Sequence, residues 1–281
     1  MRLLVRSGLL IYGVALLAIG IIHFVFGHSP IGLIPMPETT PGYRVLFSLD
    51  GGVLILAGTC LAAVVQVRWA ALIAAALFFI LYLFLGLPKE LLHPHDPASW
   101  TGAAELICLC AGALFCGRAA AGAGAGSHSG AAGNAVQDPA AGWMAPVFAA
   151  GKYLLALGLV VFGIQHIQYA DYVAALITPW IPWKLFWTYL AALAFFATAL
   201  SLVLNVLVRL SSLLMALMFF LWVLVLHGPL VAAHVGVEPQ WTSAFIALGM
   251  GGIFLVVAGT VAPMAASVSN RVASSYRPAS R

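Results

Sequence analysis

Eight long apolar stretches constrain this chain more than any other feature of its sequence. They fall near 7–27, 44–66, 68–87, 99–116, 147–169, 184–207, 208–228 and 241–262. At a helical rise of about 1.5 Å per residue, about 20 apolar residues span the roughly 30 Å hydrocarbon core of a bilayer. The membrane interior offers no water to backbone amides, so such segments fold as helices. The sequence therefore predicts an all-α integral membrane protein with about eight transmembrane helices.

The composition agrees with a lipid environment. Of the 281 residues, 63% are hydrophobic and 7% are charged, whereas soluble domains carry about 25% charged residues. The lipid bilayer is therefore the predicted partner of most of the surface. The net charge is +4, but no basic run is interleaved with aromatic residues, so no nucleic-acid partner is predicted. The four cysteines have neither C-x-x-C nor zinc-type spacing, and we interpret them as apolar packing residues with no metal site.

The two halves of the chain resemble each other. The segment GIIHF at 20–24 matches GIQHI at 163–167. A constant offset relates Arg68, Pro88, His93, Trp100 and Thr101 to Arg209, Pro229, His234, Trp241 and Thr242. An even number of helices per half predicts parallel repeats, that is, two four-helix bundles. We expect a first unit at 1–118, a flexible Gly/Ala-rich cytoplasmic linker at 119–145, a second unit at 146–265 and a basic cytoplasmic tail at 266–281.

Basic residues are distributed unequally between the two predicted faces of the membrane. One face collects Arg2, Arg6, Arg68, Arg118, Lys152, Arg209, Arg271, Arg277 and Arg281, and the other has Arg44, Lys89 and Lys184. The positive-inside rule assigns the first face, with both termini, to the cytoplasm. The outer face collects the acidic residues Glu38, Glu90, Asp96, Asp171 and Glu238.

Three ionisable residues are predicted to share one level within the first half. By the helical rise, Asp50 and Glu105 lie roughly 9 Å and His23 roughly 6 Å below the outer end of their spans. Ionisable groups inside a membrane are costly and mark functional sites. We therefore predict His23, Asp50 and Glu105 as catalytic residues. The alternative is a buried salt bridge that only locks the bundle, with Arg44 as a further partner.

The repeat-matched histidines form a second set of candidates. His93, His166 and His234 are predicted to bind a cofactor at the outer end of the bundles. The second half lacks the carboxylates, because Asp50 matches about Tyr189 and Glu105 matches Ile246. The first half is therefore expected to hold the ionisable site, and the second half to be a structural copy.

Small residues and prolines surround the predicted site. Gly13, Gly20 and Gly27 recur at seven-residue spacing, which lets helices approach closely and directs His23 into the bundle. The proline-rich segments 31–37 and 176–183 are too short to span a membrane. They are expected to lie at the outer interface, anchored by tryptophans, or to cover the site as a lid.

A first helix ending in GIxHF and followed by IPMP or PWIP resembles the DoxX-like membrane proteins, and the resemblance covers both halves. It implies a tandem, fused DoxX-like or DoxD-like protein, a helical bundle and a multi-pass location in the bacterial inner membrane. It also implies a redox-associated subunit linked to quinones or thiols, with a redox protein as partner. Thiol chemistry is disfavoured because the spacing of Cys108 and Cys110 points the two thiols apart.

Several functions are compatible with these features. In the first, the site binds a quinone head group or relays its protons, with His23 as donor and Glu105 or Asp50 as acceptor. Alternatives are a transporter for a small solute or ion, and a non-catalytic assembly protein. Haem ligation by His23 and His166 is a fourth. Whether the protein is an enzyme is left open by the sequence.

Overall fold

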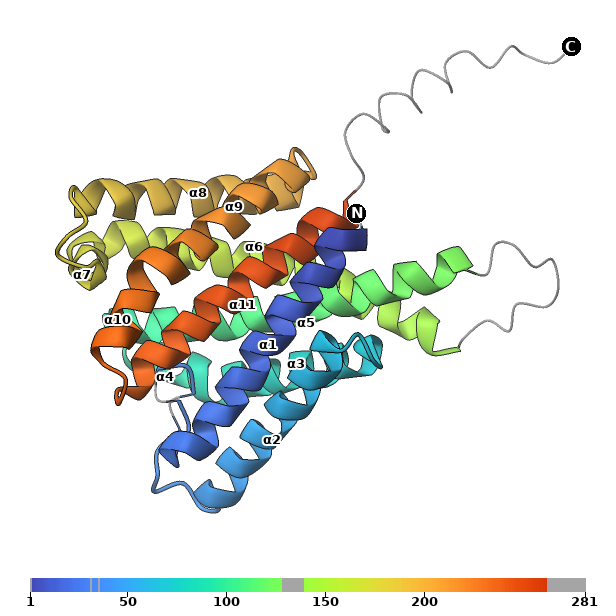
Figure 1. Cartoon of the computed structure of the whole chain (residues 1–281), viewed down its shortest axis with the longest axis horizontal. Coiled ribbons are helices and arrows are strands. Elements are labelled where there is room, and N and C mark those ends of the chain that lie inside the picture. The colour runs from blue at the N-terminus through green and yellow to red at the C-terminus, as the bar shows by residue number, and fades with distance from the viewer. Residues whose placement is uncertain (1, 31, 35, 128–138, 262–281) are drawn as a thin grey trace, which may run out of the picture.

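The computed structural model describes residues 2–30, 32–34, 36–127 and 139–261, and these ranges contain helices and loops but no β-strand (Figure 1). The first half contains α1 (Arg2–Phe26), α2 (Tyr43–Ala62), α3 (Val67–Leu81), the π-helix η1 (Tyr82–Gly86), α4 (Leu87–Leu92) and α5 (Pro97–Ser127). The second half contains α6 (Pro139–Gln168), α7 (Ala170–Leu176), α8 (Lys184–Leu204), α9 (Val208–Trp222), the π-helix η2 (Val223–His227), α10 (Gly228–Ala233) and α11 (Glu238–Thr260).

Within the described residues, eight helices are long and apolar enough to cross a membrane. This confirms the prediction of an all-α, multi-pass membrane protein that contacts the lipid bilayer. The third and seventh spans are longer than expected, reaching Leu92 and Ala233. All histidines of the described residues lie at the end of the bundle where α1 ends and α5 and α11 begin. We call it the histidine end.

The extra length of these two spans comes from a proline inside each helix. Pro88 and Pro229 have no backbone N–H, so the preceding turn cannot continue with regular α-helical hydrogen bonds. The chain shifts to the π-helices η1 and η2, in which the N–H of Leu87 donates to Tyr82 O and that of Gly228 to Val223 O. The helix thereby continues past the proline instead of ending there.

The segment between the halves differs from the expected linker at its edges. Helix α5 continues to Ser127 and α6 begins at Pro139, so part of the predicted 119–145 linker is helical. Alanine has the highest helix propensity, and extending an existing helix avoids the cost of nucleation. Residues 128–138, like the predicted tail at 266–281, lie outside the described residues.

The first helix of each half packs on the last helix of the other half. Helix α1 runs antiparallel to α11, and a Cβ atom added to Gly8 would lie 2.6 Å from the Gly252 carbonyl oxygen. Helix α6 likewise runs antiparallel to α5, where a Cβ on Gly151 would lie 2.9 Å from the Leu114 Cβ. Figure 1 shows α1 beside α11 across the middle of the molecule. The two halves are therefore joined by two extensive and similar contacts.

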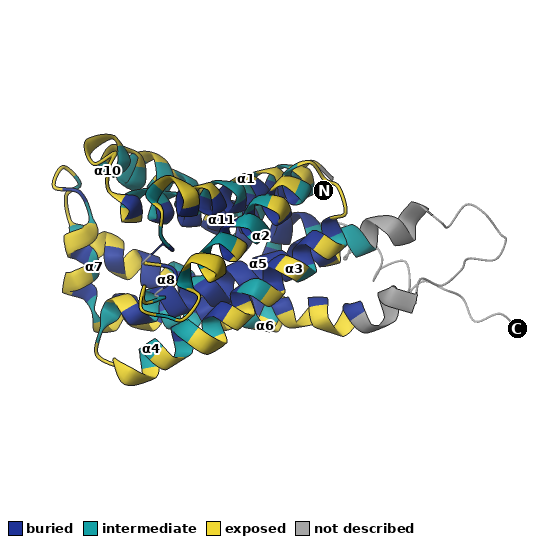
Figure 2. Ribbon diagram, turned by 90° about the horizontal axis from the view of Figure 1, so that it is seen from below, coloured by how far each residue is buried: buried dark blue, intermediate teal, exposed yellow. Residues whose placement is uncertain are grey.

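Helices α5 and α11 form the centre of the fold. Over an 18-residue stretch of each of these two spans 78% and 72% of residues are buried, against 22–50% in the matching stretches of the other six spans of the described chain. Figure 2 shows the buried residues concentrated along α5 and the exposed residues on the outer helices. Tyr12 of α1 is fully buried and donates its hydroxyl proton to Leu109 O of α5, at 2.6 Å. These contacts fix where α1 holds His23.

Apart from the first pair, α1 and α6, corresponding helices of the two halves begin 141 residues apart, as for Tyr43 and Lys184 at the starts of α2 and α8. The same spacing holds for α3 and α9, η1 and η2, α4 and α10, and α5 and α11. It places Ala191, and not Tyr189, at the position that corresponds to Asp50. The two-residue difference arises because the Leu-Phe dipeptides at 46–47 and 185–186 suggest an alignment by their sequence, although Leu46 is the fourth residue of α2 and Leu185 the second residue of α8.

Candidate functional site

The last turns of α1 bring His23 against α2. Neither Gly20 nor Gly51 has a side chain, so the two backbones come close enough that a Cβ on Gly20 would lie 2.6 Å from Gly51 O. Gly27, which ends α1 with a φ of 74°, has no neighbour within 4 Å of its Cβ position. The predicted glycine stripe thus packs through Gly13 and Gly20, and Gly27 instead provides the left-handed turn.

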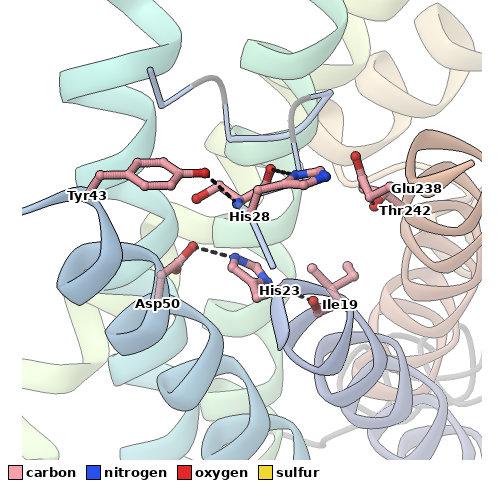
Figure 3. A network of polar contacts seen from close by, with 8 residues as sticks. Ile19, His23, His28, Tyr43, Asp50, Glu238 and Thr242 are labelled. Carbon is pink, nitrogen blue, oxygen red and sulfur yellow. Dashed lines mark hydrogen bonds and ion pairs between the residues drawn. The ribbon is translucent and has the colours of Figure 1, made fainter. Parts of the chain in front are cut away.

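His23 and Asp50 form a buried hydrogen-bonded pair. The Nε2 atom of His23 lies 2.9 Å from Oδ2 of Asp50, and the two side chains are 0% and 4% exposed (Figure 3). The Nδ1 atom of His23 lies 2.8 Å from Ile19 O. A carbonyl oxygen can only accept, so Nδ1 carries a proton and donates it.

This pattern fixes the proton content of the pair. With Nδ1 protonated, one further proton lies between Nε2 of His23 and Oδ2 of Asp50. The pair is either imidazolium with carboxylate or imidazole with carboxylic acid, and both forms have zero net charge. Oδ1 of Asp50 is buried and has no hydrogen-bond partner. In both forms Oδ1 is a free acceptor.

His166 is the counterpart of His23 in the second half, and it lacks an acidic partner. Its Nδ1 atom donates to Phe162 O at 2.8 Å, as His23 does to Ile19 O. Its ring meets Phe195 edge-on, with centroids 5.1 Å apart, and Ala191 stands where Asp50 would be. The proton-sharing pair is therefore specific to the first half.

A loop that follows α1 lies over this pair. The Ser29 amide donates to the Tyr43 hydroxyl at 3.0 Å, and the Ser29 hydroxyl is buried without a partner. Leu33 and Ile34 are fully buried, and a Cβ on Gly102 of α5 would lie 2.9 Å from Gly32 O. The first proline-rich segment therefore buries Leu33 and Ile34, although its Gly32 and Pro37 are exposed, whereas Trp180 in the second segment is 62% exposed.

The structure adds Glu238 to the candidate site residues. The sequence predicted this residue at the outer face of the membrane. Glu238 is the first residue of α11 and is 4% exposed. Its Oε1 atom accepts a hydrogen bond from the Thr242 hydroxyl, and its buried Oε2 atom has no partner. The spacing of Glu238 and Thr242, one helical turn apart, is the sequence signal that could have indicated an inward-facing carboxylate.

The other predicted site residues make no hydrogen bond or ion pair with the pair within the described residues. Glu105 is half-buried on α5, and no hydrogen bond or ion pair of the described residues joins it to His23 or Asp50. His93 and His234 are exposed at the ends of α4 and α10. Their roles, and that of Glu105, stay predictions. Arg44, the alternative partner of the carboxylates, is exposed.

The hydrogen bonds of His23 disfavour the haem ligation that the sequence left open. Both ring nitrogens of His23 are engaged, one by Ile19 O and one by Asp50. Ligation of a haem iron by His23 would require one of these buried hydrogen bonds to break. The arrangement is suited instead to holding and passing a proton.

The sequence matches no protein-family model, no curated protein and no protein of solved structure. The resemblance to DoxX-like proteins therefore stays a prediction, and the function is argued from the site.

Proposed function

We propose that this protein is a redox-associated membrane subunit that binds a quinone head group at the His23–Asp50 pair. One observation carries the proposal: a buried pair that shares a single proton leaves Asp50 Oδ1 without a partner. A buried polar atom without a hydrogen bond costs about 1–3 kcal/mol. A hydrogen-bond donor entering from the bilayer, such as a hydroxyl of the reduced head group, would satisfy it.

The residues around the pair fit a quinone head group. The unpartnered Ser29 hydroxyl is able to donate a hydrogen bond to a quinone carbonyl, and Asp50 Oδ1 is able to accept one from a hydroxyl of the reduced head group. A bound quinone would supply two-electron, two-proton redox chemistry. His23 and Asp50 would hold the proton at Nε2 or at Oδ2 without changing the net charge of the site, which limits the cost of proton transfer in a medium of low dielectric.

The same proposal includes the family and the location. We place the chain among tandem DoxX-like proteins of the bacterial inner membrane, with both termini cytoplasmic and the histidine end outside. The common 141-residue spacing of helix starts supports two copies of one unit. A redox protein would then exchange electrons with the bound quinone.

The quinone content of the purified protein tests this function. The full-length chain is extracted from native membranes in a mild detergent, and the quinone retained per protein is measured by chromatography. We expect near-stoichiometric quinone in the wild type and its loss in His23→Ala. The matched control is His166→Ala, which removes the corresponding histidine and its equivalent backbone hydrogen bond.

The result separates the proposal from its alternatives. Wild-type protein without quinone would contradict it. Equal quinone loss in His23→Ala and His166→Ala, with lowered thermal stability in both, would indicate a general effect on the fold. With unchanged stability it would assign His166 to the quinone site, as the sequence predicts. If His23→Ala lowers thermal stability but keeps the quinone, the pair is a structural lock, as in an assembly protein.

A further inference from the structure

Glu238 lies level with His23 across the junction of the two halves. In the antiparallel contact, Val5 lies beside Gly259, and Ala15 beside Gly249. Each turn further along α1 corresponds to one turn back along α11. This register places the first turn of α11, which holds Glu238, beside the last turns of α1, which hold His23.

The corresponding contact between α6 and α5 supports the same register. The side-chain amide of Gln165, one residue before His166, donates to Pro97 O at 3.1 Å and also to the Thr101 hydroxyl. Pro97 and Thr101 correspond to Glu238 and Thr242. The first turn of the last helix thus faces the residues around the matched histidine in both contacts.

The two contacts differ in their hydrogen-bond donors. Ile22 stands at the position of Gln165 and offers no side-chain donor, so Glu238 Oε2 is left unpartnered. Figure 3 shows Asp50 and Glu238 on opposite sides of His23 and His28. The second half therefore contributes to this region a buried carboxylate that the first half does not satisfy.

We infer that Glu238 completes the His23–Asp50 site and that the site binds the reduced quinol in preference to the quinone. The inference rests on the proposed function. Asp50 Oδ1 and Glu238 Oε2 are both free acceptors. The two carbonyl groups of a quinone only accept hydrogen bonds, whereas the two hydroxyl groups of a quinol donate them.

Binding of the two redox forms tests the inference. Decylubiquinol and decylubiquinone are titrated separately, without oxygen, into full-length protein freed of endogenous quinone in detergent. We expect the quinol to bind about tenfold more tightly, that is, by about 1.4 kcal/mol, because only the quinol is able to donate hydrogen bonds to the two carboxylates. Glu238→Gln should remove this preference, since an amide is able to donate to the quinone carbonyl. Glu38→Gln, at an exposed glutamate, should retain it.

Three outcomes decide the inference. Equal or tighter binding of the quinone by the wild type would overturn it and leave the proposed function intact. A preference unchanged in Glu238→Gln would also overturn it. Binding of neither form would overturn the proposed function and the inference together. If Glu238→Gln does not fold, Glu238→Asp, which retracts the carboxylate, should weaken quinol binding more than quinone binding.

Discussion

His23 of α1 and Asp50 of α2 share one proton across 2.9 Å, at a place where neither side chain reaches solvent. Removing two charges from water costs more free energy than the attraction within an ordinary surface ion pair supplies. The proton between His23 and Asp50 is able to move from the imidazole to the carboxyl group, and the pair has zero net charge in both forms. The pair therefore avoids part of that cost. The pair therefore combines a structural contact between two helices with a store for one proton.

The first prediction concerns the stability of this pair. His23→Phe should destabilise the protein by about 3–5 kcal/mol, because it leaves the Asp50 carboxyl buried and unpaired. The double variant His23→Phe with Asp50→Leu should recover most of this loss, since apolar pairs often replace buried ion pairs well. Thermal unfolding in detergent would measure the free energies. Additive losses in the double variant would show that the residues act independently.

The second prediction concerns the close contact of α1 and α2. A Cβ on Gly58 would lie 2.5 Å from the Leu17 nitrogen and 2.6 Å from Gly13 O, both backbone atoms. Gly58→Ala should therefore destabilise the fold by about 1–3 kcal/mol. Gly52 lies on the same helix with no atom within 4 Å of its Cβ position, so Gly52→Ala should be neutral or stabilising. Equal effects of the two substitutions would contradict the observed packing.

The sequence predicted the spanning helices well because their signal is local. Apolar length alone locates the eight spans to within a few residues, and the positions of His23 and Asp50 near one level follow from helical rise. The contact of α1 with α11 could not be predicted, because small residues such as Gly8 and Gly252 indicate close packing but not the partner.

The same limit explains why Glu238 was missed. At the edge of a span, a carboxylate is equally compatible with solvent and with the interior. Its burial depends on which helix lies beside it, and here that helix comes from the other half of the chain. The ends of α2 at Ala62 and of α8 at Leu204 could not be located from the sequence either, because apolar residues continue beyond both.

The third prediction concerns the start of α5. The Asp96 carboxylate accepts hydrogen bonds from the Ser99 hydroxyl at 2.7 Å and the Ala98 amide at 3.1 Å. The Ser99 hydrogen bond is the main cause that lowers the pKa of Asp96. Asp96→Ala should cost about 1 kcal/mol at neutral pH through loss of the N-cap. Val237 precedes α11 without a side-chain cap, so Val237→Ala is the matched control.

This contribution should depend on pH in one direction. A lowered pKa in the folded state means that the cap is fully effective above the ordinary carboxyl pKa of about 3.9. Protonation removes it as the pH falls through the lower folded value. Wild type and Asp96→Ala should therefore differ most near pH 7 and converge below about pH 4. A difference that grows on acidification would contradict the capping role.

The last prediction concerns orientation in the membrane. Helix α5 has 31 residues, so at about 1.5 Å per residue it is longer than the roughly 30 Å hydrocarbon core, and its two ends lie on opposite sides. The charge asymmetry predicts that His95, just before α5, is outside and that Gly124, near its other end, is cytoplasmic. Single cysteines at these positions, in a background without the four natural cysteines, would be treated with a membrane-impermeant thiol reagent. In intact cells His95→Cys should be labelled and Gly124→Cys should react only after lysis. The reverse pattern would invert the topology and place the His23–Asp50 pair at the cytoplasmic side.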